Sequence, residues 1–168
     1  KNLVRATPDA SVLPGMPCFI TAISTPFFCF MIPIKALLDN GIALQDYLSF
    51  FQYHEGQSFV RAKCKLVYLP PKSTAFVPVG WAWAAFYMDA KTGAPAWGHA
   101  WHVALWDREL FSDVPRDAMT AIRNFSEGYL VSEASKLPSF RDRCDEFKKL
   151  CDELLATSTE CFFRTPAS

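Results

Sequence analysis

The chain has 168 residues, of which 51% are hydrophobic and 20% are charged, so an intrinsically disordered protein is excluded and a substantial core is expected. Seventeen Lys and Arg balance seventeen Asp and Glu, so no overall charge attracts the chain to nucleic acid or to an anionic membrane. The fifteen Phe, five Trp and five Tyr must be buried inside the chain or against copies and partners. The length suits a single domain spanning residues 1–168.

The N-terminal part contains a long uncharged segment. Residues Ala10 to Ile34 carry no charge and are numerous enough to cross a bilayer. Prolines at positions 14, 17, 26 and 33 interrupt the segment, and a membrane helix tolerates so many breaks poorly. We therefore expect no membrane span, and instead a short apolar strand over Cys18–Ser24 followed by a turn.

Two short helices are predicted between residues 33 and 52. A proline at a favourable first helical position precedes a helix over Ile34–Asp39, and Asn40-Gly41 ends it. A second helix covers about Ala43–Gln52. It contains no Lys or Arg, which argues against a DNA-binding helix-turn-helix.

Three strands are predicted in the middle of the chain. Phe59–Tyr68 alternates as a half-buried strand, with the residues at 60, 62, 64, 66 and 68 on the buried face. Val77–Met88 carries no charge, so both of its faces are expected to be covered. Trp97–Trp106 is the third strand. Because the connections are short, we expect an antiparallel meander or sandwich.

The last third of the chain changes to a helical pattern. Asp113 and the proline two residues later predict the start of a helix over Arg116 to about Phe125. A second helix, about Phe140–Leu155, has apolar residues spaced four and three apart. The predicted fold class is α+β: a β-rich antiparallel core over about residues 17–106, with the helix pair at its start, and a helical segment over about 113–156.

A basic row is expected on the first middle strand. Arg61, Lys63 and Lys65 would project from one face about 7 Å apart, at roughly 3.3 Å per residue. Such a row can contact RNA phosphates while nearby rings stack on bases. The alternatives are a solvated strand face, or lysines that discourage pairing at a sheet edge.

An aromatic surface is expected on the next two strands. Trp81, Trp83 and Tyr87 share one face of their strand, and Trp97 and Trp101 share one face of the following strand. Small residues, among them glycine and alanine, occupy the opposite faces. The rings could fill a sandwich core, form a subunit interface, or line a ligand cavity.

No motif for metal binding, cofactor binding or catalysis stands out, and no cofactor is expected. None of the six cysteines forms a C-x-x-C pair, and buried free thiols are the simplest interpretation. His99 and His102 lie three residues apart on a predicted strand, so they face opposite sides and cannot share a metal without a β-bulge. An active site assembled from distant residues stays open.

The order of short motifs between residues 42 and 95 is distinctive. A short helix is followed by Phe51-Gln52-Tyr53-His54-Glu55, Phe59-Val60-Arg61, the strand Lys65-Leu66-Val67-Tyr68-Leu69-Pro70-Pro71, a Ser/Thr loop, the strand Gly80 to Tyr87, Met88-Asp89 and Pro95. This order resembles the middle strands of single jelly-roll coat proteins from small icosahedral RNA viruses. The resemblance implies a jelly-roll-like fold, no enzymatic activity, self-assembly into a shell, and RNA contact through basic residues on the inner side.

We therefore expect a soluble structural or assembly protein that self-associates through aromatic surfaces into a homo-oligomer or larger assembly, a viral coat subunit being one form of it. A weak RNA contact through residues 61–65 belongs to this expectation. The first alternative is a monomeric binding module whose apolar pocket is framed by Trp81, Trp83, Trp97 and Trp101. The second is a small enzyme that uses His99, His102 or Asp107.

Overall fold

The computed structural model describes residues 4–6, 14–23, 25–47, 58, 62–87, 100–104, 108–132 and 138–160. The chain, which we expected to form one domain, divides into two compact units, Lys1–Trp106 and Asp107–Ser168. The boundary falls between the predicted β-rich core and the predicted helical segment. No helix among the described residues is long and apolar enough to cross a membrane.

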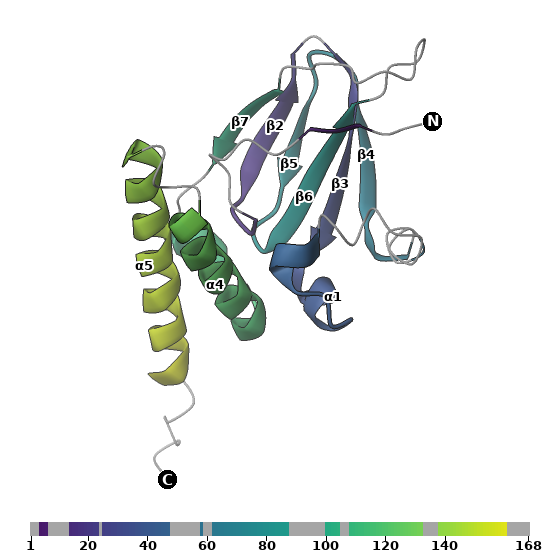
Figure 1. Ribbon diagram of the computed structural model, residues 1–168. Helices are drawn as coiled ribbons and strands as arrows, with labels where there is room; N and C mark the ends of the chain where they lie inside the picture. The colour runs from purple at the N-terminus through teal and green to yellow at the C-terminus, as the bar shows by residue number, and fades with distance from the viewer. Residues whose placement is uncertain are drawn as a thin grey trace. The chain divides into compact units, whose positions relative to one another are not determined.

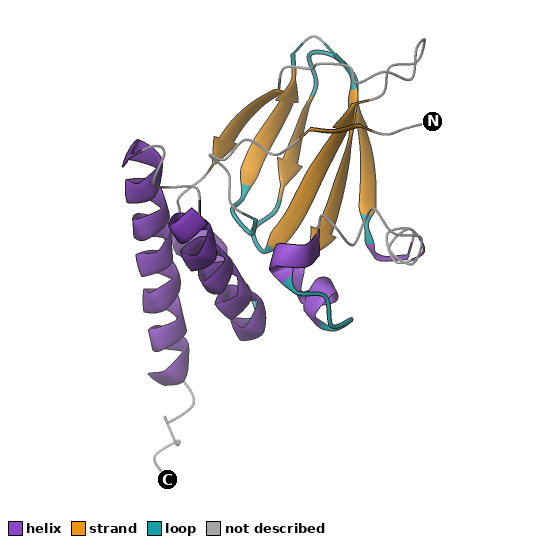
Figure 2. Ribbon diagram, in the orientation of Figure 1, coloured by secondary structure: helices purple, strands orange, loops and turns teal. Residues whose placement is uncertain are grey.

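The first unit contains two antiparallel sheets, drawn as arrows in Figures 1 and 2. One sheet has the strand order β1-β6-β3-β4, and the other has the order β5-β2-β7. The strands span Val4–Ala6 (β1), Cys18–Ala22 (β2), Phe27–Pro33 (β3), Lys65–Leu69 (β4), Thr74–Val77 (β5), Trp81–Tyr87 (β6) and Ala100–Ala104 (β7). The α+β class with antiparallel sheets therefore agrees with the prediction.

The predicted meander of three consecutive strands is wrong. The strands that correspond to it, β4, β6 and β7, do not pair with one another: β4 and β6 both pair with β3, and β7 pairs with β2. Strand β3, which lies between β6 and β4, was not predicted. Pro26 precedes this strand and Pro33 is its last residue, and prolines are typical of turns and of helix starts.

The uncharged stretch predicted as one strand over Val77–Met88 forms parts of two strands in different sheets. β5 ends at Val77 and β6 begins at Trp81, with Pro78-Val79-Gly80 between them. Gly80 has φ 72°, a conformation that residues with a Cβ rarely adopt. Its N–H donates to the Gly15 carbonyl at 2.9 Å, which fixes the turn against another segment.

The two sheets share one buried core. Along β2, Cys18, Ile20 and Ala22 are buried whereas Phe19 is exposed. Along β3, Phe27, Cys29 and Met31 are buried. The side chain of Cys18 hydrogen-bonds the Trp83 side chain of the other sheet and interacts electrostatically with Cys29. These contacts show that the buried faces of the two sheets meet, as in a sandwich.

A short helical segment of the first unit follows β3 and packs on the rest of that unit. The predicted first helix is confirmed as α1, Ile34–Leu38, and Gly41 after it has φ 71°. The predicted second helix begins as a 3-10 turn, η1, over Leu44–Asp46, and its later part lies outside the described residues. The buried Tyr47 hydroxyl donates to the Trp83 carbonyl at 3.0 Å, which ties this segment to β6.

The second unit is a pair of helices. After a 3-10 turn, η2 (Arg108–Phe111), come α4 (Arg116–Ser132) and α5 (Pro138–Glu160), both longer than predicted. The helices are antiparallel, since Arg123 contacts Asp152 whereas Glu127, one turn later, contacts Lys148. The apolar face of α4 packs with that of α5 around Ala118, Met119, Ile122, Phe147 and Cys151, all buried. The rings of Phe111 and Phe147 lie 5.8 Å apart.

Candidate interaction surface

Trp83, one of the predicted contact residues, lies in the core of the first unit. Its side chain is 3% exposed and hydrogen-bonds Cys18. Burial raises the pKa of the Cys18 thiol to about 12, and this hydrogen bond opposes part of that shift. The burial of Trp83 agrees with the alternative in which the rings fill the sandwich core.

Trp81 is half-buried and is contacted by Lys65, which lies on β4 at the edge of the same sheet. The Lys65 ammonium lies 5.2 Å from the centre of the Trp81 ring, at a distance typical of a cation–π contact. This contact directs the Lys65 side chain along the sheet toward β6. A side chain held in this way is less available to an external partner.

The predicted aromatic surface does not form on neighbouring strands. Trp81 and Trp83 are in β6 of the four-stranded sheet, whereas Trp101 is in β7 of the three-stranded sheet. The strand register places Tyr87 opposite Phe27 and Trp101 opposite Thr21. Trp97 lies outside the described residues. The prediction failed here because β6 and β7, although consecutive in the sequence, belong to different sheets.

The predicted basic row is not formed on one strand. Strand β4 begins at Lys65, and Lys63 precedes it in a helical stretch at residues 62–63. Arg61 lies outside the described residues. A helical turn changes the direction of successive side chains by about 100°, so Lys63 and Lys65 do not keep the regular spacing that a strand would give them.

Among the described residues of the first unit, the large apolar side chains with the highest exposed fractions lie on the outer face of β3 and β4. Leu66 is 56% exposed and Tyr68 is 55% exposed. The Phe28 and Tyr68 rings lie 5.1 Å apart, and Phe30 is opposite Leu66 in the register. We call Phe28, Phe30, Leu66 and Tyr68 the β3–β4 patch. A surface of this kind is typical of protein–protein contact.

This patch reverses the predicted orientation of β4. Leu66 and Tyr68 were expected on the buried face and Lys65 on the outer one. In the structure Val67 and Leu69 are opposite Cys29 and Phe27 of the core, and Leu69 is 2% exposed. Because side chains alternate along a strand, Leu66 and Tyr68 must then face outward.

The outer face of the second sheet carries a smaller apolar cluster. The rings of Phe19 and Phe76 lie 5.2 Å apart, and their exposed fractions are 42% and 43%. Beside them the hydroxyls of Thr21 and Thr74 are 2.9 Å apart. The hydroxyl pair makes this face more polar than the β3–β4 patch.

Four of the cysteines have raised pKa values that make them poorly reactive. Cys18, Cys29 and Cys151 are buried and free, and burial raises the pKa of each to about 12. Cys64 is half-buried and free, and burial raises its pKa to about 11. Thiols with such values are poor nucleophiles at neutral pH.

The predicted histidines give no evidence of a chemical site. His99 lies outside the described residues, and the register places His102 opposite Ile20. Within the part of the chain that the structure describes, no three side chains of the kinds that hold metals come together.

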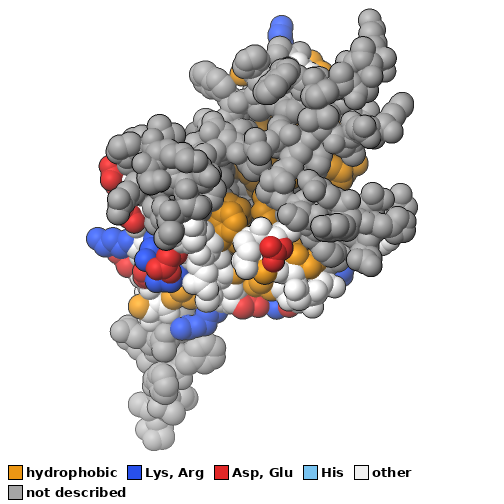
Figure 3. Space-filling model, in the orientation of Figure 1, with side chains coloured by type: hydrophobic (Ala, Val, Ile, Leu, Met, Phe, Trp, Pro, Cys, Tyr) orange, Lys and Arg blue, Asp and Glu red, His pale blue; other side chains and the backbone are white. Residues whose placement is uncertain are grey.

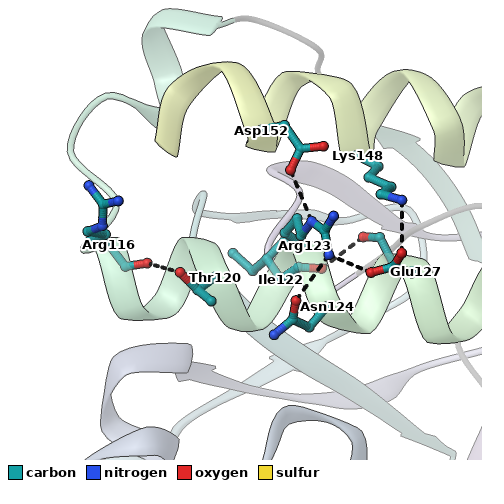
Figure 4. Close-up of polar contacts among 9 residues, drawn as sticks. Arg116, Thr120, Ile122, Arg123, Asn124, Glu127, Lys148 and Asp152 are labelled. Carbon is teal, nitrogen blue, oxygen red and sulfur yellow. Dashed lines mark hydrogen bonds and ion pairs between the residues drawn. The ribbon is translucent and has the colours of Figure 1, made fainter. Parts of the chain in front are cut away.

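Charged side chains of both signs gather on the helical unit (Figure 3). Arg123 Nε donates to Asp152 at 3.0 Å, Lys148 Nζ donates to Glu127 at 3.0 Å, and Arg123 also contacts Glu127, so that the two helices are joined by one network (Figure 4). The hydrogen bond from Lys148, followed by the charge of Arg123, lowers the pKa of Glu127. Every charge in this network has a partner, so the network joins the helices and does not form a binding site.

A small hollow in the helical unit is lined by both apolar and polar side chains. Its lining residues are Phe111, Ser112, Val114, Arg116, Met119, Leu154 and Leu155. The hollow is small, and one of its polar side chains, Arg116, is at the start of α4. The β3–β4 patch is the more extensive apolar surface, and we take it as the candidate interaction surface.

No family model matches the chain, and a search of curated proteins finds no match. The interpretation of the patch therefore depends on its geometry and chemistry.

Proposed function

We propose that this protein is a non-enzymatic structural subunit that self-associates through the β3–β4 patch. The observation that carries the proposal is the exposure of Leu66 and Tyr68, each more than half exposed, beside the Phe28 ring. Burying apolar surface releases about 25 cal/mol per Å2, so an exposed face of this composition gains free energy when a partner covers it. Phe and Tyr side chains have few rotatable bonds and lose little entropy in an interface.

The partner that fits the patch best is a second copy of the chain. The patch carries no charge, and the chain as a whole has a formal net charge of zero, so long-range repulsion between copies is small. An exposed sheet face suits another protein surface better than a small ligand, which is usually enclosed by a cavity. The Trp-lined pocket of the alternative function gains no support, because Trp83 is buried and hydrogen-bonded.

A coat subunit is the finer form of this proposal. Two antiparallel sheets with a shared core support this form, because the jelly rolls of viral shells are also built from two packed sheets. RNA contact through residues 61–65 gains no support from the described residues, because Lys63 and Lys65 do not form a row and Lys65 covers the Trp81 ring.

Sedimentation velocity over a range of protein concentrations tests self-association. We expect the wild-type sedimentation coefficient to rise with concentration, and the double variant Leu66→Ser, Tyr68→Ser to shift this rise to higher concentration. Loss of one central aromatic contact weakens an interface by about 2 kcal/mol, or roughly thirtyfold in dissociation constant. The matched control is Phe19→Ser, Phe76→Ser on the other sheet, which changes two side chains of similar exposure.

The result that contradicts the proposal is a wild-type chain that sediments as a monomer at every concentration. A control variant that dissociates the assembly while the Leu66, Tyr68 variant does not would move the interface to the other sheet. Near-ultraviolet circular dichroism establishes that each variant keeps the packing of its rings.

A further inference from the structure

Strand β4 is the terminal strand of its sheet among the described residues (Figure 1), and β3 is its partner on the inner side. An edge strand presents unpaired backbone N–H and C=O groups, which are a template for another strand. We infer that β4 pairs antiparallel with β4 of a second copy, about a two-fold axis at Val67. This inference rests on the proposed self-association and specifies its geometry.

Two of the usual features that prevent such pairing, proline and a β-bulge, are absent from β4. Its five residues include no proline, and its register with β3 runs through five consecutive pairs without a bulge. The one charged residue, Lys65, is directed toward the Trp81 ring at 5.2 Å. A lysine that is held over a ring of its own sheet leaves the strand edge accessible.

The sequence of β4 is complementary to itself in this arrangement. A two-fold axis at Val67 places Leu66 opposite Tyr68 of the partner subunit, and Tyr68 opposite Leu66 of the partner subunit. Both residues face outward and are more than half exposed in one chain. Cross-strand pairs of an aromatic and an aliphatic residue stabilise sheets. The β3–β4 patches of the two copies then form one continuous face across an eight-stranded sheet.

The charge of β4 favours the antiparallel direction. The antiparallel register separates the two copies of Lys65 by four residue positions, about 13 Å at 3.3 Å per residue. That distance exceeds the Debye length of about 8 Å at physiological ionic strength, so their repulsion is largely screened. A parallel pair would set the two lysines side by side.

Disulfide cross-linking of two variants, each with one cysteine added to the native six, tests the register. Chains carrying Leu66→Cys and chains carrying Tyr68→Cys are mixed and oxidised, and the 66–68 peptide is sought by mass spectrometry. Directly opposite residues bring their Cβ atoms to about 5 Å, within reach of a disulfide after a small adjustment. Each variant oxidised alone places its cysteines on a diagonal at about 7–8 Å, which is too far.

We expect the mixture of Leu66→Cys and Tyr68→Cys chains to give a cross-linked dimer. We expect none of the three controls to give one: either variant oxidised alone, oxidised wild type, or a mixture of Phe19→Cys and Phe76→Cys chains. If wild type self-associates but the Leu66→Cys and Tyr68→Cys mixture gives no cross-link, the β4 pairing is refuted and the proposed function stands. If wild type is monomeric at every concentration, both are refuted. Sedimentation of the same mixtures before oxidation distinguishes these two outcomes.

Discussion

Lys72 occupies a backbone conformation that glycine would adopt with less strain. The Ser73 N–H donates to the Pro70 carbonyl at 3.2 Å, which closes a four-residue turn, and Lys72 at its third position has φ 65°. Proline at the second position and a positive φ at the third define a type II turn, in which glycine is favoured at the third position. We predict that Lys72→Gly stabilises the first unit.

The magnitude follows from two opposing effects. A left-handed conformation costs a residue with a Cβ about 1–2 kcal/mol, and glycine avoids this cost. Glycine in turn loses about 0.5–1 kcal/mol more conformational entropy on folding. Because Lys72 is exposed, little packing is lost. The expected net gain in the free energy of unfolding is about 0.5–1 kcal/mol, which is roughly 2–8 °C in Tm for a unit of this size.

Urea unfolding followed by tryptophan fluorescence measures this change, because every Trp of the chain lies in the first unit. The matched control is Lys72→Ala, which removes the same side chain but keeps the Cβ, and we expect its stability to remain within about 0.5 kcal/mol of wild type. Lys72→Asn, which tolerates the left-handed region better than alanine, should lie between the two. Equal stability of the glycine and alanine variants would refute the reasoning, since the Cβ would then cause no strain.

Three further predictions concern the core, the thiols and the helix pair. Phe147→Ala should lower the free energy of unfolding of the helical unit by about 3–5 kcal/mol, because Phe147 is fully buried against Phe111. Unfolding followed by circular dichroism at 222 nm measures this loss, and a loss below about 1 kcal/mol would contradict that packing. Among Cys18, Cys29, Cys64 and Cys151, Cys64 should react first with iodoacetamide at pH 8 under native conditions, because it is the least buried and its pKa is about 11. Peptide mass spectrometry measures the order of labelling, and earlier labelling of Cys18 or Cys29 would argue against the sandwich core. The pKa of Glu127 is lowered in the folded chain, so its contribution to stability is present above its unfolded value and is lost as the pH falls through the folded value. The difference in the free energy of unfolding between wild type and Glu127→Gln should therefore shrink on acidification. Glu146→Gln, at an exposed position, is the control. A difference for Glu127→Gln that does not depend on pH would contradict the ion-pair network.

Local sequence signals located several elements correctly. A proline followed by apolar residues and then Asn-Gly predicted α1, and the structure confirms the helix and the positive φ of Gly41. Asp113 and the proline two residues later predicted α4, and apolar residues spaced four and three apart predicted α5, although both helices extend beyond the predicted ends. These features depend on neighbours within a few residues, so the sequence is sufficient to locate them.

The candidate site was not predictable in the same way. Leu66, Val67, Tyr68 and Leu69 are all apolar, so either alternation of β4 would bury hydrophobic side chains. The lysine at position 65 favoured one orientation, but the register with β3 selected the other by placing Val67 and Leu69 against the core. A one-residue change of register exchanges the two faces of a strand, and only the long-range partner fixes that choice.

The aromatic excess, the balanced charge, the antiparallel strands and the main helices were determined by the sequence itself, because composition and local periodicity specify burial and secondary structure. The tertiary structure alone decided which rings are buried and which are exposed. Trp83 fills the core because β6 packs beside β3, and Tyr68 is exposed because β4 is paired with β3 in one particular register. Strand partners come from segments up to 86 residues apart, as for Cys18 and Ala104, and local periodicity contains no information about such pairs.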